Sequence, residues 1–284
     1  MLPEIRYWSS ISSVGLSSME EVNMETIHAI TEGIANAYIV NDKDGVMVVD
    51  PGSRGAALAV LDYCNNILGV SPRESIKIVA MTHYHIDHIG GIATLLEHCG
   101  PDTMVIATEY ARDYMAHKRR LSSMHNWPSC MQTAFCCLKG DVPPAFHSYD
   151  SLAGIPDFAN LSIPVDQGRF KFYENGFNGT IGFGDWLVLP TPGHTEDSVS
   201  FYSPSTMALI CGDFILNVEP GSFPRGRING FHNDYIAIQS SLKTLKENIN
   251  VAALYPGHGD VVMRQAGSKG SILRSVGGSV GIFS

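Results

Sequence analysis

The chain of 284 residues is 44% hydrophobic and 17% charged, with 28 Gly and 15 Pro, which is typical of a folded globular protein and excludes a disordered, collagen-like or coiled-coil chain. No run approaches the roughly 18–20 apolar residues of a membrane helix, and residues 1–6 do not begin a signal peptide, so we expect a cytoplasmic protein without membrane contact. The formal net charge of −9 argues against nucleic acid as a partner.

The first half of the chain alternates short apolar runs with segments of helical spacing. Two apolar runs on either side of a turn-like sequence predict a β-hairpin. A helix, a buried strand and a second helix are then predicted. These elements cover residues 34–41 and 45–50 for the hairpin, 56–68 for the first helix, 76–81 for the strand and 91–99 for the second helix. This order predicts an α/β fold.

The second half repeats the pattern, and each apolar run ends in a His or an Asp. The runs at residues 186–189, 207–210 and 251–254 lead to His194, Asp213 and His258 respectively. Residues 233–248 have helical spacing and would pack on the sheet. We therefore expect two related αβ halves that share one site within a single domain, residues 1–266.

Residues 109–180, between the halves, lack clear periodicity and are rich in aromatic and Met side chains. Long segments of this kind inside a compact domain are usually functional or disordered. The composition favours a packed helical or loop lid, with a satellite core as the alternative. The Gly- and Ser-rich residues 267–284 predict a flexible tail.

The six Cys residues are too few for a disulfide scaffold and include no Cys-x-x-Cys pair. Reduced thiols in the cytosol are therefore expected. Whether the neighbouring Cys136 and Cys137 are reactive is left open, because nothing near them in the sequence indicates a lowered pKa.

The densest group of potential metal ligands directly follows the predicted strand that ends at residue 81. It comprises His83, His85, Asp87 and His88. Imidazole and carboxylate are ligands of zinc, iron and manganese, and a strand-to-helix loop can aim them at one point. Gly90 and Gly91 follow and would let the next helix pass close by. The sequence therefore predicts a metal site.

These residues resemble the metallo-β-lactamase superfamily, whose His-x-His-x-Asp-His motif they match. The rest of the family pattern follows in order, with Asp50 ending an early strand, His194 in Thr-Pro-Gly-His-Thr, Asp213 in Cys-Gly-Asp and His258 in Tyr-Pro-Gly-His-Gly. The resemblance extends over about residues 27–262. It implies a four-layer αβ/βα sandwich with a lid insertion.

The resemblance also implies two metal ions, with zinc favoured and iron or manganese as alternatives. It assigns His83, His85 and His194 to one metal, Asp87, His88 and His258 to the second, and Asp213 as a bridge. Five His and two carboxylates give three terminal ligands per metal plus a bridge, which leaves open positions for water and substrate. Asp50 is expected to accept the free N–H of a ligating imidazole, and capping of its own turn is the alternative.

Two close metal ions acidify a bridging water to hydroxide and polarise a carbonyl or phosphoryl oxygen, so hydrolysis is the expected reaction. The resemblance implies that Asp87 also passes a proton to the leaving group. Arg225 and Arg227 could bind a carboxylate or phosphate headgroup. His232 lies in the connection after Asp213, where family members often shape the substrate pocket. The basic run at residues 117–120 is a second candidate, with a solvated surface as the alternative.

The motifs around Asp213 and His258 look like the glyoxalase II, lactonase and β-lactamase-like-protein-2 side of the superfamily. Typical β-lactamases lack that bridging carboxylate and are exported, which disfavours antibiotic hydrolysis. Glyoxalase II carries a C-terminal glutathione-binding domain, whereas 26 of the 284 residues follow His258, so a glutathione thioester is not favoured.

We therefore expect a hydrolase of a small carboxylic ester, thioester or lactone, with a small molecule as its partner. A phosphodiesterase or ribonuclease that uses the same site is the alternative. A β-lactamase and a non-catalytic binding module are less favoured alternatives. A homodimer is left open.

Overall fold

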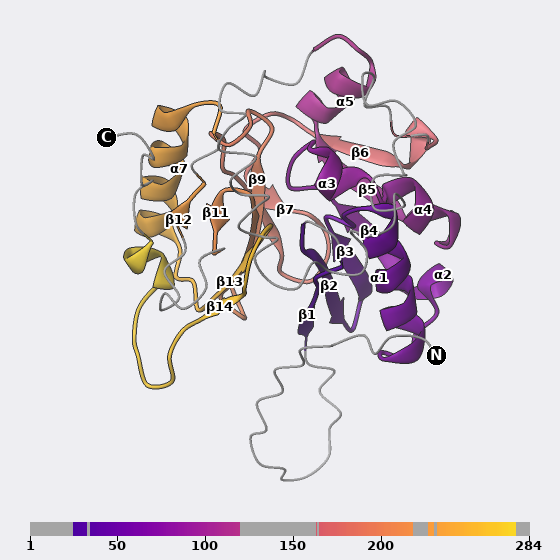
Figure 1. The fold of residues 1–284 in the computed structure, drawn as a ribbon, viewed down its shortest axis with the longest axis horizontal. Helices are drawn as coiled ribbons and strands as arrows, with labels where there is room; N and C mark the ends of the chain where they lie inside the picture. Colours follow the sequence, from indigo (N-terminus) through magenta and orange to yellow (C-terminus); the bar gives the residue numbers. More distant parts are fainter. Residues whose placement is uncertain are drawn as a thin grey trace.

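Two six-stranded sheets face each other at the centre of the molecule, and helices cover the outer surface of each (Figure 1). This computed structural model describes residues 25–32, 35–119, 163, 165–217, 227–229 and 232–276. The layer order of helices, sheet, sheet and helix confirms the predicted four-layer αβ/βα sandwich.

The first sheet has the strand order β1-β2-β3-β4-β5-β6. Its first three strands are antiparallel, and β3 to β6 are parallel. The strands are β1 Thr26–Ile30, β2 Ala37–Asp42, β3 Gly45–Val49, β4 Ile76–Ala80, β5 Met104–Thr108 and β6 Phe170–Tyr173. β2 and β3 form the predicted hairpin, in which Asp42 pairs with Gly45 and the Asp42 carboxylate accepts the N–H of Asp44 at 2.6 Å.

Short helices and one longer helix flank the first sheet. They are α1 Arg54–Asn66, α2 Pro72–Ser75, α3 Ile86–Ile89, α4 Ile92–Glu97 and α5 Glu109–Met115. α1 begins two residues earlier than predicted, because the Ser53 hydroxyl caps it by accepting the N–H of Ala56. The predicted close approach after the motif is present, since a Cβ on Gly91 would lie 2.9 Å from the Cβ of Ala57.

The second sheet has the order β14-β13-β10-β9-β8-β7, in which β10 and β13 are parallel and the other pairs antiparallel. Its strands are β7 Gly179–Thr180, β8 Leu187–Pro190, β9 Val199–Ser203, β10 Ala208–Gly212, β13 Ala253–Pro256 and β14 Val262–Met263. β11 Ile215–Leu216 and β12 Arg227–Ile228 pair separately. α7, Tyr235–Asn248, covers this sheet and is capped by Asp234.

Three buried clusters fill the three interfaces between the layers. One lies between the first sheet and its helices, and another between the second sheet and α7. The central cluster joins the sheets and includes the fully buried side chains of Tyr38, Trp186 and Phe201. Because side chains alternate along a strand, each sheet supplies residues to both of its faces. Both sheets are thereby held in contact beneath the site.

Parts of the expected lid and tail belong to the folded core. Within 109–180 the structure contains α5, the 3-10 helix η3 Gln167–Arg169, β6 and β7, whereas 120–162 and 164 lie outside the described residues. In the expected tail, the 3-10 helix η4 Ile272–Ser275 buries Leu273 completely against the second sheet and α7. Among the described helices, none is long and apolar enough to cross a membrane.

Replacing Phe201 by Ala tests the packing between the sheets. We expect Phe201→Ala to lower the free energy of unfolding by about 3–5 kcal/mol, because the fully buried ring leaves a cavity. Urea unfolding followed by circular dichroism measures the change. The control Ile236→Ala, at a side chain that is 80% exposed on α7, should change it by less than about 0.5 kcal/mol. Equal effects of the two substitutions would contradict the proposed core.

Candidate metal centre

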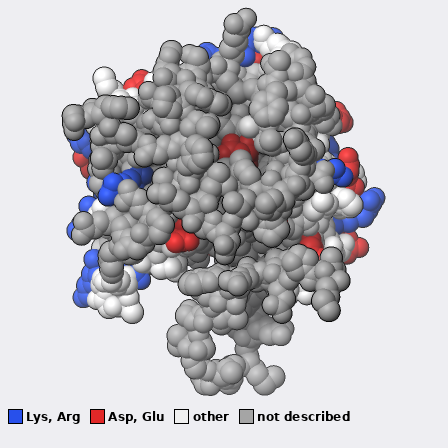
Figure 2. Space-filling view, viewed as in Figure 1, with Lys and Arg blue, Asp and Glu red and all other residues white. Residues whose placement is uncertain are grey.

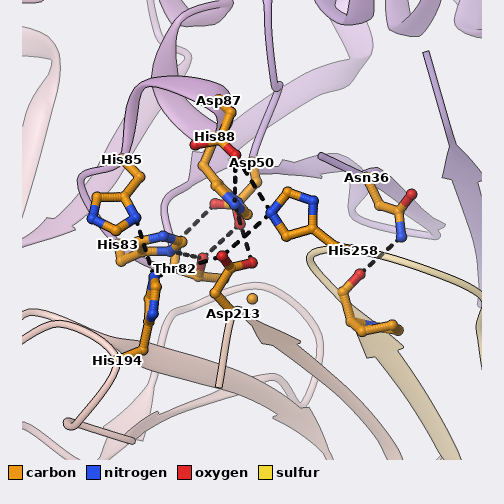
Figure 3. A network of polar contacts seen from close by, with 12 residues as sticks. Asn36, Asp50, Thr82, His83, His85, Asp87, His88, His194, Asp213 and His258 are labelled. Carbon is orange, nitrogen blue, oxygen red and sulfur yellow. Dashed lines mark hydrogen bonds and ion pairs between the residues drawn. The ribbon is translucent and has the colours of Figure 1, made fainter. Parts of the chain in front are cut away.

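The site lies where the loops that follow five strands meet between the two sheets. β8, β10 and β13 run in the same direction, because β9 is antiparallel to β8 and to β10 while β13 is parallel to β10. In the first sheet β3 and β4 are parallel. The loops at these strand ends carry Asp50, His83, His194, Asp213 and His258. Strand direction therefore explains why positions far apart in the sequence meet (Figure 3).

The seven residues predicted to bind metal, called the seven candidate ligands below, form two groups. The ligand atoms in each group lie within 4.8 Å of one another. The first group is His83, His85, His194 and Asp213, and the second is Asp87, His88 and His258. These groups correspond to the two predicted ligand sets, with Asp213 placed in the first.

Asp213 lies between the two groups (Figure 3). Its Oδ1 is 3.2 Å from Nε2 of His88, and its Oδ2 is 3.3 Å from Nε2 of His258. The same Oδ2 is 3.5 Å from Nε2 of His194 in the first group. The carboxylate therefore faces both groups, which is the position that a bridging ligand requires.

Three buried atoms of the candidate ligands lack a hydrogen-bond partner among the described residues. They are Nε2 of His83, Nε2 of His88 and Oδ1 of Asp213. The last two lie 3.2 Å apart, close enough for an ion pair when His88 carries a proton. A buried polar atom without a partner costs about 1–3 kcal/mol. Imidazole nitrogens and carboxylate oxygens that lie close together can bind a divalent cation, so these residues fit metal ions.

The protonation states of the first group suit metal binding. Burial lowers the pKa of His83 well below its usual value, and the imidazoles of His88 and His85 lower it further. Burial also lowers the pKa of His85 to about 3, and His194 adds to that shift. Both rings are therefore neutral near pH 7, which is the form that binds a metal ion.

The second group has the opposite electrostatic character. Burial disfavours a charge on His88, but the carboxylates of Asp213, Asp87 and Asp50 outweigh it and raise its pKa to about 10. Burial likewise opposes ionisation of Asp213, yet His258 and His88 hold its pKa well below the usual value. Asp213 thus stays ionised, and in the absence of a metal ion the positive charge of His88 offsets it.

Asp50 contacts protein donors through both of its carboxylate oxygens. Its Oδ1 accepts the N–H of Thr82 at 2.8 Å, and its Oδ2 accepts the Thr82 hydroxyl at 2.5 Å and lies 2.8 Å from Nδ1 of His88. Asp50, His83 and His88 also form a group within 4.8 Å, but these contacts favour orienting His88 over binding a metal directly. The φ of Asp50 is 49°, a left-handed conformation that is uncommon outside glycine.

Thr82 and Asn229 contact candidate ligands and were not predicted from the sequence. The Thr82 hydroxyl lies 3.0 Å from Nδ1 of His83, so the opposite ring nitrogen faces the centre of the site. The side-chain amide of Asn229 lies 3.1 Å from Nδ1 of His194. The position of Thr82 directly before the motif could have indicated its role. Asn229 is 35 residues from His194, and nothing in the local sequence indicates this contact.

Two of the three predicted substrate contacts, Arg227 and His232, lie in the described part of the chain. Arg227 pairs with Leu216 between β12 and β11, and the His232 ring lies 5.3 Å from that of Tyr235 at the start of α7. Arg225, like Cys136 and Cys137, lies outside the described residues. A role of these arginines and of His232 in substrate binding stays a prediction.

The loop that carries His194 contacts the basic run predicted at residues 117–120. Nη1 of Arg119 lies 2.9 and 2.7 Å from the two carboxylate oxygens of Glu196, and the Tyr114 hydroxyl donates to Glu196 at 2.8 Å. A cavity of about 490 Å³ adjoins this loop and is lined by Gly193, Thr195 and Glu196 among others. Tyr114 and Arg119 thus contact the loop that carries His194.

Curated relatives of the chain are metallo-hydrolases and related proteins. The chain is 26% identical over 202 residues to the probable metallo-hydrolase YflN of Bacillus subtilis, covering 68% of this chain and 65% of that protein. It is 28% identical over 217 residues to the hydroxyacylglutathione hydrolase of Idiomarina loihiensis, covering 75% and 60%. A beta-lactamase-like protein 2 homolog of Caenorhabditis elegans is 24% identical, covering 80% and 56%. The chain therefore spans 56–65% of the length of these relatives.

Solved structures share the same fold. The BLEG-1 B3 metallo-beta-lactamase superposes with a TM-score of 0.55 at 19% identity, covering 84% of this chain and 94% of that chain. The archaeal superfamily protein ST1585 of Sulfolobus tokodaii superposes with a TM-score of 0.52 at 20% identity, covering 84% and 82%. The family model of the metallo-beta-lactamase superfamily matches residues 30–258, which include all seven candidate ligands. On this match, the chain belongs to the metallo-β-lactamase superfamily.

Proposed function

We propose that the chain is a hydrolase that binds two divalent metal ions and cleaves a small carboxylic ester, thioester or lactone. The observation that carries the proposal is the pair of ligand groups, both of which the buried carboxylate of Asp213 faces. Zinc is the expected metal, with iron or manganese as alternatives. When bound, such ions supply an acidified water as nucleophile and polarise the bond under attack.

The chain's own residues hold the candidate ligands in place and limit the access of water to them. His88, His194 and Asp213 have side chains that are at most 8% exposed, so bulk water has little access to the ligand atoms. Asp50 and Asn229 contact the outward-facing nitrogens of His88 and His194 and thereby hold the rings in place. Ligands that are already oriented need little rearrangement when substrate arrives.

Asp87 lies where a proton could be exchanged with substrate. Its side chain is 25% exposed, compared with 8% for Asp213, and its Oδ2 lies 3.4 Å from Nε2 of His258. Burial opposes its ionisation, but His88 and His258 hold its pKa below the usual value, so Asp87 is an anion near pH 7. We infer that Asp87 takes the proton of the attacking water and delivers it to the leaving group.

The choice of substrate class is supported by relatives and by the surface. A relative at 28% identity is named for the hydrolysis of hydroxyacylglutathione, which is a thioester. The cavity of about 490 Å³ beside the His194 loop has the size of a small-molecule site. In Figure 2 the visible Lys and Arg side chains lie mainly near the margins together with Asp and Glu, and the formal net charge of −9 does not favour a nucleic-acid substrate.

A reducing compartment such as the cytosol is part of the proposal. Cys64, Cys99 and Cys211, the cysteines within the described residues, are buried and form no disulfide. Burial raises the pKa of the Cys64 thiol to about 12 and that of Cys99 to about 11, so both are unreactive structural side chains.

Metal content tests the proposed site. The purified chain should hold about two equivalents of zinc, iron or manganese by elemental analysis, because two ligand groups are present. Removal by a chelator should abolish hydrolysis, and adding back the metal should restore it. Full activity of the metal-free chain would contradict the proposal.

Asp87→Asn tests the proton-transfer role. The amide can still offer an oxygen to a metal but cannot carry the proton, so kcat should fall about 100-fold or more while the metal content stays unchanged. Asp44→Asn, on the exposed turn between β2 and β3, is the matched control and should leave kcat unaltered. Near-normal turnover of Asp87→Asn with full metal content would show that Asp87 has no such role.

A chromogenic panel tests the substrate class. The metal-loaded chain should hydrolyse thioesters, carboxylic esters or lactones with a higher kcat/KM than bis-aryl phosphodiesters or a cephalosporin. The ratio of kcat/KM values is the relevant quantity because it reports transition-state stabilisation for each substrate. If phosphodiester cleavage exceeded carboxylic ester cleavage by orders of magnitude, the site would instead belong to a phosphodiesterase.

A further inference from the structure

We propose that Asn36 and Tyr38 are positioning residues that set the metal affinity of the group formed by Asp87, His88 and His258. They belong to the first sheet and to the segment that leads into it, whereas His258 belongs to a loop of the second sheet. The proposal rests on the proposed function, because it requires two metal-binding groups that can be perturbed separately.

Asn36 makes hydrogen bonds to the backbone on both sides of His258. Its Nδ2 donates to the carbonyl of Pro256 at 3.0 Å and to that of Gly259 at 2.8 Å. Its backbone N–H donates to the carbonyl of Gly257 at 2.7 Å. Asn36, which is 6% exposed, therefore holds Pro256 and Gly259 through its side chain and Gly257 through its backbone, so its contacts lie on both sides of His258 (Figure 3).

Tyr38 strengthens the same attachment. Its hydroxyl donates to the carbonyl of Pro256 at 2.6 Å, and Nδ2 of Asn36 lies 3.2 Å from that hydroxyl. Tyr38 is 1% exposed, and burial raises its pKa well above the usual value, so the hydroxyl keeps its proton and stays a donor. Pro256 thus accepts hydrogen bonds from two buried side chains of the opposite sheet.

The loop has no room to shift on its other side. The N–H of Gly257 donates to the carbonyl of Gly212 at 2.7 Å. A Cβ on Gly257 would overlap Oδ1 of Asp213 and would lie 2.7 Å from Cε1 of His88. The His258 loop is therefore enclosed between Asn36 on one side and two candidate ligands on the other. Loss of the Asn36 contacts would free it to move.

Movement of this loop would change one metal group more than the other. Nε2 of His258 lies 3.4 Å from Oδ2 of Asp87, within the second group. The rings of the first group have separate supports, since Asn229 contacts His194 and Thr82 contacts His83. Asn36 should thus affect the second group selectively, whereas general loss of stability would weaken both groups together.

Cobalt titration of the metal-free full-length chain tests the proposal. Binding is followed by calorimetry and by visible absorption, and the variants His194→Ala and His258→Ala identify which event belongs to which group. Asn36→Ala should weaken the event that His258→Ala removes by about 10–100-fold and leave the other within about twofold. The matched control Asn229→Ala should show the reverse pattern.

Tyr38→Phe provides a second variant that keeps the buried ring and removes one hydrogen bond. It should weaken the same event by about 2–10-fold. Equal weakening of both events, no weakening of the His258 event, or failure of both variants to fold would overturn the positioning role. Uptake of a single cobalt ion by the unaltered chain would overturn the proposed function itself and this proposal with it.

Discussion

The burial of many ionisable groups in one seam is the constraint on which the rest of this structure depends. Five imidazoles and three carboxylates meet between the sheets: His83, His85, His88, His194, His258, Asp50, Asp87 and Asp213. All of them except His85 and Asp87 are buried. Each ionised carboxylate would be costly there without a partner of opposite charge. In the absence of metal ions, the protonated imidazole of His88, whose pKa is raised, supplies part of that positive charge. Two divalent cations would supply more of this positive charge. They would also bind the buried ligand atoms that lack a hydrogen-bond partner among the described residues.

The two halves of the fold hold this cluster together through backbone contacts that join their loops. The N–H of Val199 donates to the carbonyl of Thr82 at 2.8 Å, which connects β9 of the second sheet to the loop that carries His83. Asn36 joins the first sheet to the loop of His258. The packed interface between the sheets fixes the positions of these loops relative to each other. Contacts of this kind hold catalytic side chains in fixed positions, which favours fast chemistry.

Much of the fold and of the ligand set could be predicted from the sequence, because periodicity and motifs are local. The helix of residues 91–99 and the strand of residues 76–81 were predicted and occur as α4, Ile92–Glu97, and β4, Ile76–Ala80. The strands β1, β5, β6 and β9 were missed. Each is a run of four or five residues whose pattern is too short to stand out, and it becomes a strand by pairing with its neighbours. Asn36 and Asn229 were missed for a related reason, since contacts across many residues leave no local spacing to recognise.

The central claim is that the chain binds two metal ions in the seam and that Asp213 contacts both. Anomalous diffraction from crystals of the zinc-loaded chain tests it most directly. The account predicts two peaks, one within bonding distance of His83, His85 and His194 and the other of Asp87, His88 and His258, with an Asp213 oxygen within bonding distance of each metal ion. A single peak, or peaks away from these side chains, would contradict it.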